Sequence, residues 1–208
     1  MKLLAFVLAF STTACATLRP PPPPPVGHPA ERVKQSVIRI TGESFDGSRQ
    51  YFTCTGFAID VRKYMTAAHC VPDLIMGVPY VLKADGRVAS PIKVDPKTDL
   101  AVILVDLQKP ALTFRSSPVK WLETVWGMGF GYGFTVPITT RHTLQARKYN
   151  LGEEEIYPGN AYESPFIGGM SGGPIFDQHG LVVGVVQLSS PIISYGVDTD
   201  TIAAFLKE

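Results

Sequence analysis

The residues Gly168-Gly-Met-Ser-Gly-Gly-Pro174 form the most informative stretch of this sequence. Glycines on both sides of Ser171 allow a sharp turn that exposes the serine hydroxyl, because glycine adopts backbone conformations that other residues avoid. The same turn leaves the N–H groups of Gly169, Met170 and Ser171 free to converge on one point. A nucleophilic hydroxyl and an oxyanion-binding site require this combination. A glycine-rich hairpin turn with an incidental serine is the alternative explanation.

Two segments earlier in the chain carry the other groups that a reactive serine needs. In Met65-Thr-Ala-Ala-His-Cys70, small residues precede His69, so that its ring can lie in a crowded cleft. In the second segment, Asp99 stands directly before the apolar run 100–105. A carboxylate at the head of a buried strand needs a polar partner, and the imidazole Nδ1–H of His69 would be one. Taken singly, each segment could also be structural.

Together the three segments resemble the trypsin/chymotrypsin-like serine protease superfamily. Thr-Ala-Ala-His-Cys is similar to the family's histidine motif, Asp-Leu-Ala-Val to its aspartate motif and Gly-Met-Ser-Gly-Gly-Pro to its serine motif, in the family's order. The resemblance covers roughly residues 33–206. It looks closest to the catalytic domain of bacterial high-temperature-requirement proteases, and we expect no PDZ domain after Glu208.

This resemblance implies a serine endopeptidase that acts on polypeptides without a cofactor or a metal. It assigns His69 as the general base, Asp99 as the acid that orients it and Ser171 as the nucleophile. The N–H groups of Gly169 and Ser171 would form the oxyanion hole. A catalytically silent, protease-like binding module is the rival function, and a structural lipoprotein of the cell envelope is a third.

The pattern of short strands agrees with an all-β fold. From residue 33 onward, alternating or β-rich runs are bounded by Gly, Pro or Asp, and a connector with two prolines at 108–119 divides them into two groups. This pattern alone fits two small barrels or one sandwich. The resemblance implies two six-stranded antiparallel barrels of the chymotrypsin type and a short C-terminal helix. The expected parts of the peptidase domain (31–208) are barrel one at about 31–110, barrel two at about 118–198 and the helix at about 199–207.

The cysteines and the N-terminus predict export. Lys2 and the apolar run 3–10 have the character of a signal peptide over residues 1–16, since a helical run of that length, ~12 Å, is too short to cross a bilayer core of about 30 Å. Cleavage near Ala14 or Ala16 and a lipoprotein signal with an acylated Cys15 both remain open, and Thr12 departs from the lipoprotein pattern. We expect a periplasmic or envelope location, with membrane attachment if Cys15 is lipidated.

A proline-rich linker is expected over residues 17–30. The unbroken proline run 20–25 would form a stiff polyproline II rod of roughly 19 Å. Such a rod would hold the following domain away from the membrane.

The resemblance also implies a disulfide between Cys54 and Cys70. Relatives with a cysteine beside the catalytic histidine commonly pair it across the hairpin that leads to that histidine. A bridge that closes about 16 residues contributes roughly 3 kcal/mol, and export permits it. Zinc binding by Cys54, His69 and Cys70 is the competitor, but it lacks a clear fourth ligand.

Substrate preference is less constrained by the sequence. In trypsin an aspartate six residues before the nucleophile selects Lys or Arg, and here that position is Pro165. Glu163 lies close enough to keep a basic preference open. Gln187, Leu188 and Ser189 resemble the strand that pairs with the substrate backbone and forms one wall of the pocket. We expect a small or medium uncharged side chain on the N-terminal side of the cleaved bond.

The overall composition fits a folded exported enzyme better than a nucleic-acid-binding protein. Of the 208 residues, 45% are hydrophobic and 18% are charged, and the formal net charge is only +1. Without basic runs, the chain offers no electrostatic footprint for nucleic acid. An α/β-hydrolase is excluded by motif order, since only His179 follows Ser171.

Overall fold

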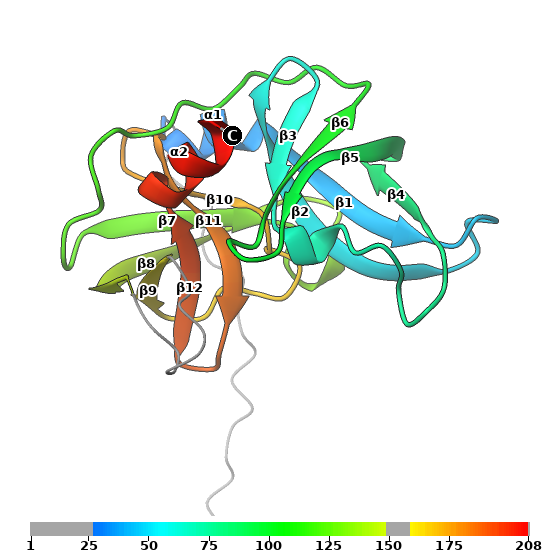
Figure 1. The fold of residues 1–208 in the computed structure, drawn as a ribbon. Coiled ribbons are helices and arrows are strands. Elements are labelled where there is room, and N and C mark those ends of the chain that lie inside the picture. Colours follow the sequence, from blue (N-terminus) through cyan, green and yellow to red (C-terminus); the bar gives the residue numbers. More distant parts are fainter. Residues whose placement is uncertain (1–26, 149–158, 208) are drawn as a thin grey trace, which may run out of the picture.

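A computed structural model describes residues 27–148 and 159–207, and its strands form two closed barrels beside one another (Figure 1). All pairs of neighbouring strands are antiparallel. The all-β prediction of two six-stranded barrels with a short C-terminal helix is therefore confirmed. The expected signal peptide, Cys15 and linker residues 17–26 lie outside the described residues.

Barrel one closes in the order β1-β2-β3-β6-β5-β4. Its strands are β1 (Val37–Glu43), β2 (Gln50–Asp60), β3 (Lys63–Thr66), β4 (Val81–Ala84), β5 (Arg87–Asp95) and β6 (Leu100–Val105). The strands β3 and β4 are the shortest of the six, with four residues each. A short 3₁₀ turn, η1 (Ala68–Cys70), follows β3.

Barrel two closes in the order β10-β11-β12-β9-β8-β7. Its strands are β7 (Thr124–Gly129), β8 (Ile138–Arg147), β9 (Gly159–Glu163), β10 (Pro174–Phe176), β11 (Val182–Ser189) and β12 (Ile193–Asp198). A second 3₁₀ turn, η2 (Gly131–Gly133), follows β7. Helix α2 (Thr199–Lys207) begins directly after β12, where the carboxylate of Asp198 accepts a hydrogen bond of 2.9 Å from the N–H of Thr201.

Helix α1 (Pro29–Lys34) was not predicted from the sequence, and it overlaps the last two residues of the expected linker. Its N-terminal cap is His28, whose Nδ1 accepts a hydrogen bond of 3.1 Å from the N–H of Ala30. Histidine is not a usual capping residue, which explains why the helix start was missed. Ala30 and Val33 are buried and anchor α1 against the barrels.

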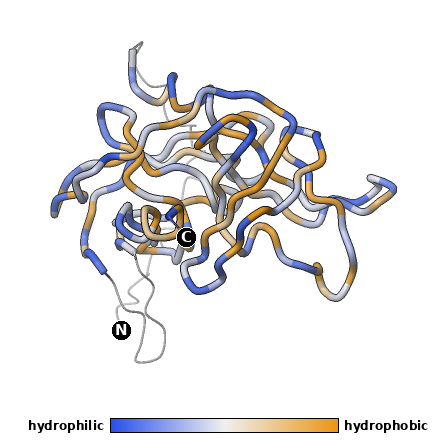
Figure 2. Tube along the Cα trace, turned by 45° about the horizontal axis from the view of Figure 1, so that its top comes forward, coloured by the Kyte–Doolittle hydropathy of each residue, from blue (hydrophilic) through white to orange (hydrophobic). Residues whose placement is uncertain are grey.

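Within the described residues, three buried apolar clusters hold the fold together. One fills barrel one, one fills barrel two, and the third lies between the barrels and joins both helices to them. The third cluster includes Phe57, Leu100, Phe176, Val185 and Phe205. Hydrophobic stretches therefore lie mainly inside the molecule and hydrophilic ones mainly in peripheral loops (Figure 2). This shared core fixes the position of one barrel relative to the other.

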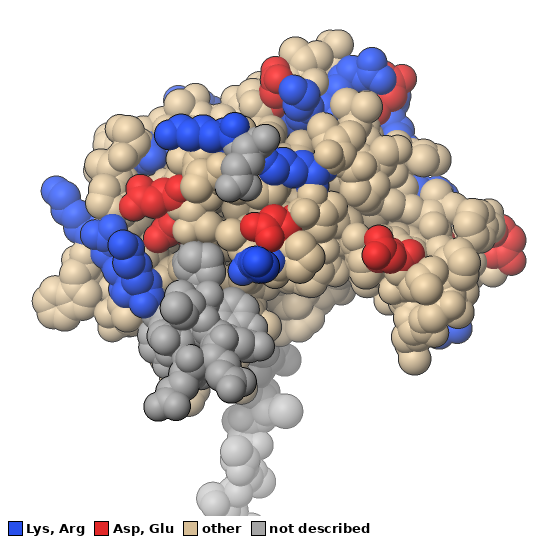
Figure 3. Space-filling model, in the orientation of Figure 1, with Lys and Arg blue, Asp and Glu red and all other residues tan. Residues whose placement is uncertain are grey.

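The surface shows no field of one sign on the face seen in Figure 3, where acidic and basic residues are interspersed. Within residues 27–148 and 159–207, neither helix has the length and apolar character that crossing a bilayer requires.

Candidate active site

Asp99 is delivered by a tight turn between β5 and β6. The carboxylate of Asp95 accepts hydrogen bonds from the N–H of Lys97 (3.0 Å) and from the hydroxyl of Thr98 (2.7 Å), which closes the turn. The hydrogen bond from Thr98 is the main reason why the pKa of Asp95 is lowered. Asp99 then adopts a left-handed conformation with φ of 53°, which Asp tolerates better than most residues. Its carboxylate consequently faces η1.

His69 is held against Asp99 through both its backbone and its ring. The N–H of His69 donates to Oδ1 of Asp99 at 2.9 Å, and Nδ1 of the ring lies 2.8 Å from Oδ2 and 3.0 Å from Oδ1. The side chain of Asp99 is only 14% exposed, whereas that of His69 is 48% exposed. A carboxylate can only accept here, so Nδ1 is the donor of this pair, and in the neutral ring Nε2 then keeps a free lone pair.

Ser171 lies on the loop that precedes β10, and backbone hydrogen bonds fix this loop to both barrels. The carbonyl of Ser171 accepts from the N–H of Thr55 in β2 (2.8 Å), and the N–H of Gly172 donates to the carbonyl of Val186 in β11 (2.7 Å). Gly172 has φ of 81°, and an added Cβ would lie 2.2 Å from Oγ1 of Thr66. Glycine is therefore required at this position to bring the loop so close to barrel one.

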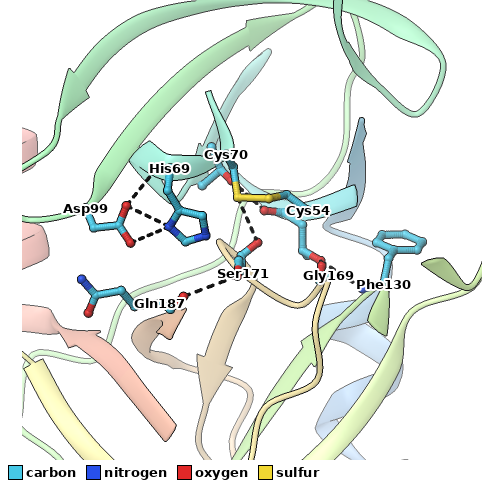
Figure 4. Close-up of a disulfide and its surroundings, with 10 residues drawn as sticks. Cys54, His69, Cys70, Asp99, Phe130, Gly169, Ser171 and Gln187 are labelled. Carbon is cyan, nitrogen blue, oxygen red and sulfur yellow. Dashed lines mark hydrogen bonds and ion pairs between the residues drawn. A yellow bond between two sulfur atoms is a disulfide. The ribbon is translucent and has the colours of Figure 1, made fainter. Parts of the chain in front are cut away.

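The three predicted side chains meet where the two barrels face each other. Figure 4 shows the ring of His69 between Asp99 and Ser171. The hydroxyl of Ser171 donates to the carbonyl of Gln187 at 3.4 Å, and the described residues include no hydrogen bond between Ser171 and His69. A contact of 3.4 Å is long for a hydroxyl donor, and catalytic hydrogen bonds are often loose without substrate. A rotation about χ1 can redirect this hydroxyl.

Two N–H groups beside Ser171 are free to bind an anion. In the part of the chain that the structure describes, the N–H groups of Gly169 and Ser171 have no acceptor. The carbonyl of Gly168 accepts from the N–H of Tyr132 at 2.7 Å, so it turns away from the site. Gly169 has φ of 99°, and a Cβ there would lie 2.4 Å from the carbonyl oxygen of Phe130. The arrangement can stabilise an oxyanion that forms next to Ser171.

The expected disulfide between Cys54 and Cys70 is present, with a Cα–Cα distance of 6.0 Å. It joins β2 to η1, and Sγ of Cys70 lies 3.7 Å from the carbonyl oxygen of Ser171. The bridge therefore supports the segment that carries His69 and the loop that carries Ser171. The zinc alternative would need both sulfurs as thiolates, and in the disulfide they are bonded to each other.

The residues expected to contact substrate are placed unevenly. Leu188 is 47% exposed, and Pro165 and Ser189 are also exposed. The side chain of Gln187 is instead buried, at 4% exposure, so that its backbone carbonyl is the group that lies beside Ser171. Ser194 was not predicted from the sequence, and it holds the segment on both sides of Pro165. Its Oγ accepts from the N–H of Phe166 (2.5 Å) and donates to the carbonyl of Ser164 (2.6 Å).

A second histidine lies buried behind this region. His142 is 1% exposed, its Nδ1 lies 3.2 Å from the carbonyl oxygen of Glu163, and its Nε2 lies 2.6 Å from Oγ1 of Thr140. Its ring packs on Phe166 with centroids 4.1 Å apart. Burial lowers the pKa of His142, which favours the neutral ring.

We expect His142 to make the folded state acid-sensitive. Because its folded pKa lies below the unfolded value of about 6.5, its contribution to stability is complete above that pH and is lost as the pH falls towards the folded pKa. In chemical unfolding at pH 7 and pH 5, the free energy of unfolding should fall more for the wild type than for His142→Gln. The difference has a limit of about 2 kcal/mol, because the unfolded histidine takes up its proton over the interval of about 1.5 pH units between its pKa of about 6.5 and pH 5. Equal pH dependence in the two proteins would contradict the prediction.

Comparisons with known proteins relate this chain to serine proteases. The family model described as trypsin-like peptidase domain matches residues 54–185. A probable periplasmic serine endoprotease, DegP-like, from Chlamydia trachomatis is 34% identical over 140 residues, covering 63% of this chain and 27% of that protein. The serine protease Rv3671c of Mycobacterium tuberculosis is 31% identical over 139 residues, covering 64% of this chain and 35% of that protein.

The chain thus spans about a third or less of the length of these curated relatives. Among solved structures, the active form of the Rv3671c protease from M. tuberculosis superposes with a TM-score of 0.73 at 25% identity. The superposition covers 98% of this chain and 93% of that one.

Proposed function

This chain belongs to the trypsin-like peptidase family, and we propose that it is a serine endopeptidase in which Ser171, His69 and Asp99 act together. The observation that carries the proposal is the pairing of His69 with Asp99 at 2.8 Å, on the side of the ring away from Ser171. Such a pair leaves Nε2 as a base directed towards the loop of the nucleophile.

The chemistry follows from the roles of these groups. Ser171 attacks the carbonyl carbon of the peptide bond while Nε2 of His69 takes the hydroxyl proton, and His69 later gives that proton to the departing amine. Asp99 keeps the proton on Nδ1 and stabilises the imidazolium that forms. The N–H groups of Gly169 and Ser171 bind the oxyanion of the tetrahedral intermediate. Water then hydrolyses the acyl-enzyme on Ser171 by the same steps.

A fluorophosphonate probe tests this proposal directly, because it reacts with an activated serine and not with an ordinary hydroxyl. We expect the purified protein to be labelled, and mass spectrometry of its peptides to locate the label on Ser171. Labelling should also abolish the hydrolysis of an unfolded protein substrate. No labelling of the oxidised protein, or labelling at another serine, would contradict the proposal.

A catalytically silent binding module is the second candidate. The observation that favours it is the hydrogen bond from Ser171 to the carbonyl of Gln187, since a hydroxyl held there is not transferring its proton to His69. The same probe separates the two candidates, because a silent module would bind peptides but remain unlabelled.

We further propose that the enzyme prefers a small or medium uncharged residue before the cleaved bond. Pro165 offers no charge, and the carboxylate of the exposed Glu163 accepts a hydrogen bond of 3.1 Å from Gln145 on β8. Neither of these two positions therefore offers a buried negative charge that would select Lys or Arg. Cleavage of a peptide library should favour Ala, Val or Thr over Lys and Arg by about tenfold or more, the usual scale for such pocket contacts. Strong cleavage after Lys or Arg would refute this.

An exported location fits this function. The DegP-like relative is named a periplasmic protein, and a disulfide forms and persists in oxidising compartments. We propose a periplasmic or envelope location, with lipidation of Cys15 as the means of attachment.

A further inference from the structure

We infer that Thr55, on β2 of barrel one, is a positioning residue that holds the oxyanion-binding loop of barrel two in its active shape. This inference rests on the proposed function, because it assigns Thr55 a part in the same site. Thr55 is fully buried and makes no contact that would let it act on a substrate itself.

The hydroxyl of Thr55 joins two segments of barrel two. It donates to the carbonyl of Gly169 at 2.7 Å and accepts from the N–H of Phe130 at 3.0 Å. Figure 4 shows Gly169 and Phe130 together on the side of Ser171 opposite to His69. The hydroxyl has one proton to give, and Gly169 receives it, while Phe130 occupies an acceptor position. The backbone N–H of Thr55 also donates to the carbonyl of Ser171 at 2.8 Å.

These contacts fix the peptide planes on both sides of Gly169. The carbonyl of Gly168 is held by the N–H of Tyr132, and the carbonyl of Gly169 is held by Thr55. In a trans peptide the C=O and the following N–H point in opposite directions, so that anchoring the carbonyl of Gly168 aims the N–H of Gly169 at the site. Phe130 stands directly before η2, which carries Tyr132. Thr55 therefore fixes the peptide plane that follows Gly169 directly. Through Phe130 it also supports the segment that fixes the plane before Gly169.

Barrel two is shaped to receive this one side chain. A Cβ added at Gly129 would lie 2.6 Å from Oγ1 of Thr55, and one at Gly173 would lie 3.1 Å from its Cγ2. A Cβ at Gly172 would lie 2.4 Å from the carbonyl oxygen of Thr55. The three glycines therefore let barrel two approach Thr55 closely, and a side chain at any of these positions would push the two barrels apart here.

The expected effect is on the rate of the chemical step. Negative charge appears on the oxyanion only in the transition state, so a misplaced N–H of Gly169 lowers kcat and leaves KM nearly unchanged. Removing an oxyanion-hole donor typically lowers kcat by about 10²- to 10³-fold. Displacing one through Thr55 should cost less than its removal, on the order of 10- to 100-fold.

The experiment compares three variants of the full-length oxidised protein. Thr55→Val keeps the shape and removes the hydroxyl, and Thr55→Ser keeps the hydroxyl. Thr41→Val is the matched control, since Thr41 is also buried in barrel one and its hydroxyl donates to Glu43 at 2.8 Å. We expect kcat to fall about 10- to 100-fold in Thr55→Val with KM within about twofold, and to stay near the wild-type value in Thr55→Ser and Thr41→Val.

The rate of amide hydrogen exchange in peptides that span residues 166–173 provides a measurement that does not depend on catalysis. We expect faster exchange there in Thr55→Val, by about tenfold or more, and wild-type exchange in the other two variants. If the wild type neither reacts with the probe nor cleaves protein, the proposed function fails, and exchange alone decides the role of Thr55. An unchanged kcat in Thr55→Val of an active enzyme, or unchanged exchange of this loop, would overturn the inference. If Thr55→Val fails to fold, Thr55→Ala, which also lacks the hydroxyl, replaces it in both measurements and is judged by the same outcomes.

Discussion

Ser171→Ala is expected to lower kcat/KM on an unfolded protein substrate by about 10³- to 10⁶-fold. The variant keeps Gly169, His69 and Asp99 but has no atom that can attack the peptide carbonyl. The fold should persist, because the loop is fixed by backbone hydrogen bonds from Thr55 and to Val186, which the substitution leaves in place.

The measurement is hydrolysis of a fluorescent protein substrate together with thermal unfolding, whose midpoint should change by no more than about 2 °C. Ser117→Ala, at an exposed position of the connector, is the matched control and should behave as the wild type. Activity in Ser171→Ala equal to that of the control would end the proposed mechanism.

Asp99→Asn should lower kcat by about 10⁴-fold, although it changes only one heavy atom. The reason lies in how Asp99 is held. The N–H of His69 donates to Oδ1, so the amide oxygen of an asparagine would occupy that position and its NH₂ group would face Nδ1 of the ring. Nδ1 would then have to accept a hydrogen bond, which places the ring proton on Nε2. A protonated Nε2 in a neutral ring cannot take the proton of Ser171.

The rate of labelling by the fluorophosphonate probe measures this effect, because labelling requires the same base. Asp106→Asn, at the other end of β6, removes a carboxylate that is 81% exposed and pairs with Arg62 at 3.4 Å, and serves as the matched control. A labelling rate in Asp99→Asn within tenfold of that control would show that Asp99 does not set the tautomer of His69.

The strands and the three side chains could be predicted because their signals are local, whereas the choice of two barrels over one sandwich came from the resemblance of the three motifs to the trypsin-like family. Glycine on both sides of Ser171, alanines before His69 and a lone carboxylate before a buried strand each restrict the chain over a few residues. Strand alternation likewise reports burial within each strand.

Contacts between distant segments could not be predicted in the same way. Thr55, Ser194 and Tyr132 matter through hydrogen bonds that depend on how the barrels and loops register against each other, and one sequence does not reveal that register. Gln187 shows the same limit: its place on β11 was foreseen, but the burial of its side chain was not. Helix α1 was missed because a histidine caps it.

The disulfide between Cys54 and Cys70 also has a practical consequence for the preparation of this protein. The two sulfur atoms and a ring nitrogen of His69 all lie within 4.8 Å of one another. Reduction would turn this corner into a pair of thiols beside an imidazole, a set of donors with a strong affinity for zinc. We therefore expect that protein produced in a reducing cytosol and purified on a metal column can bind a metal ion through the two thiols and His69, the proposed base. Folding in an oxidising compartment keeps the disulfide formed, and a chelator during purification keeps His69 free of metal.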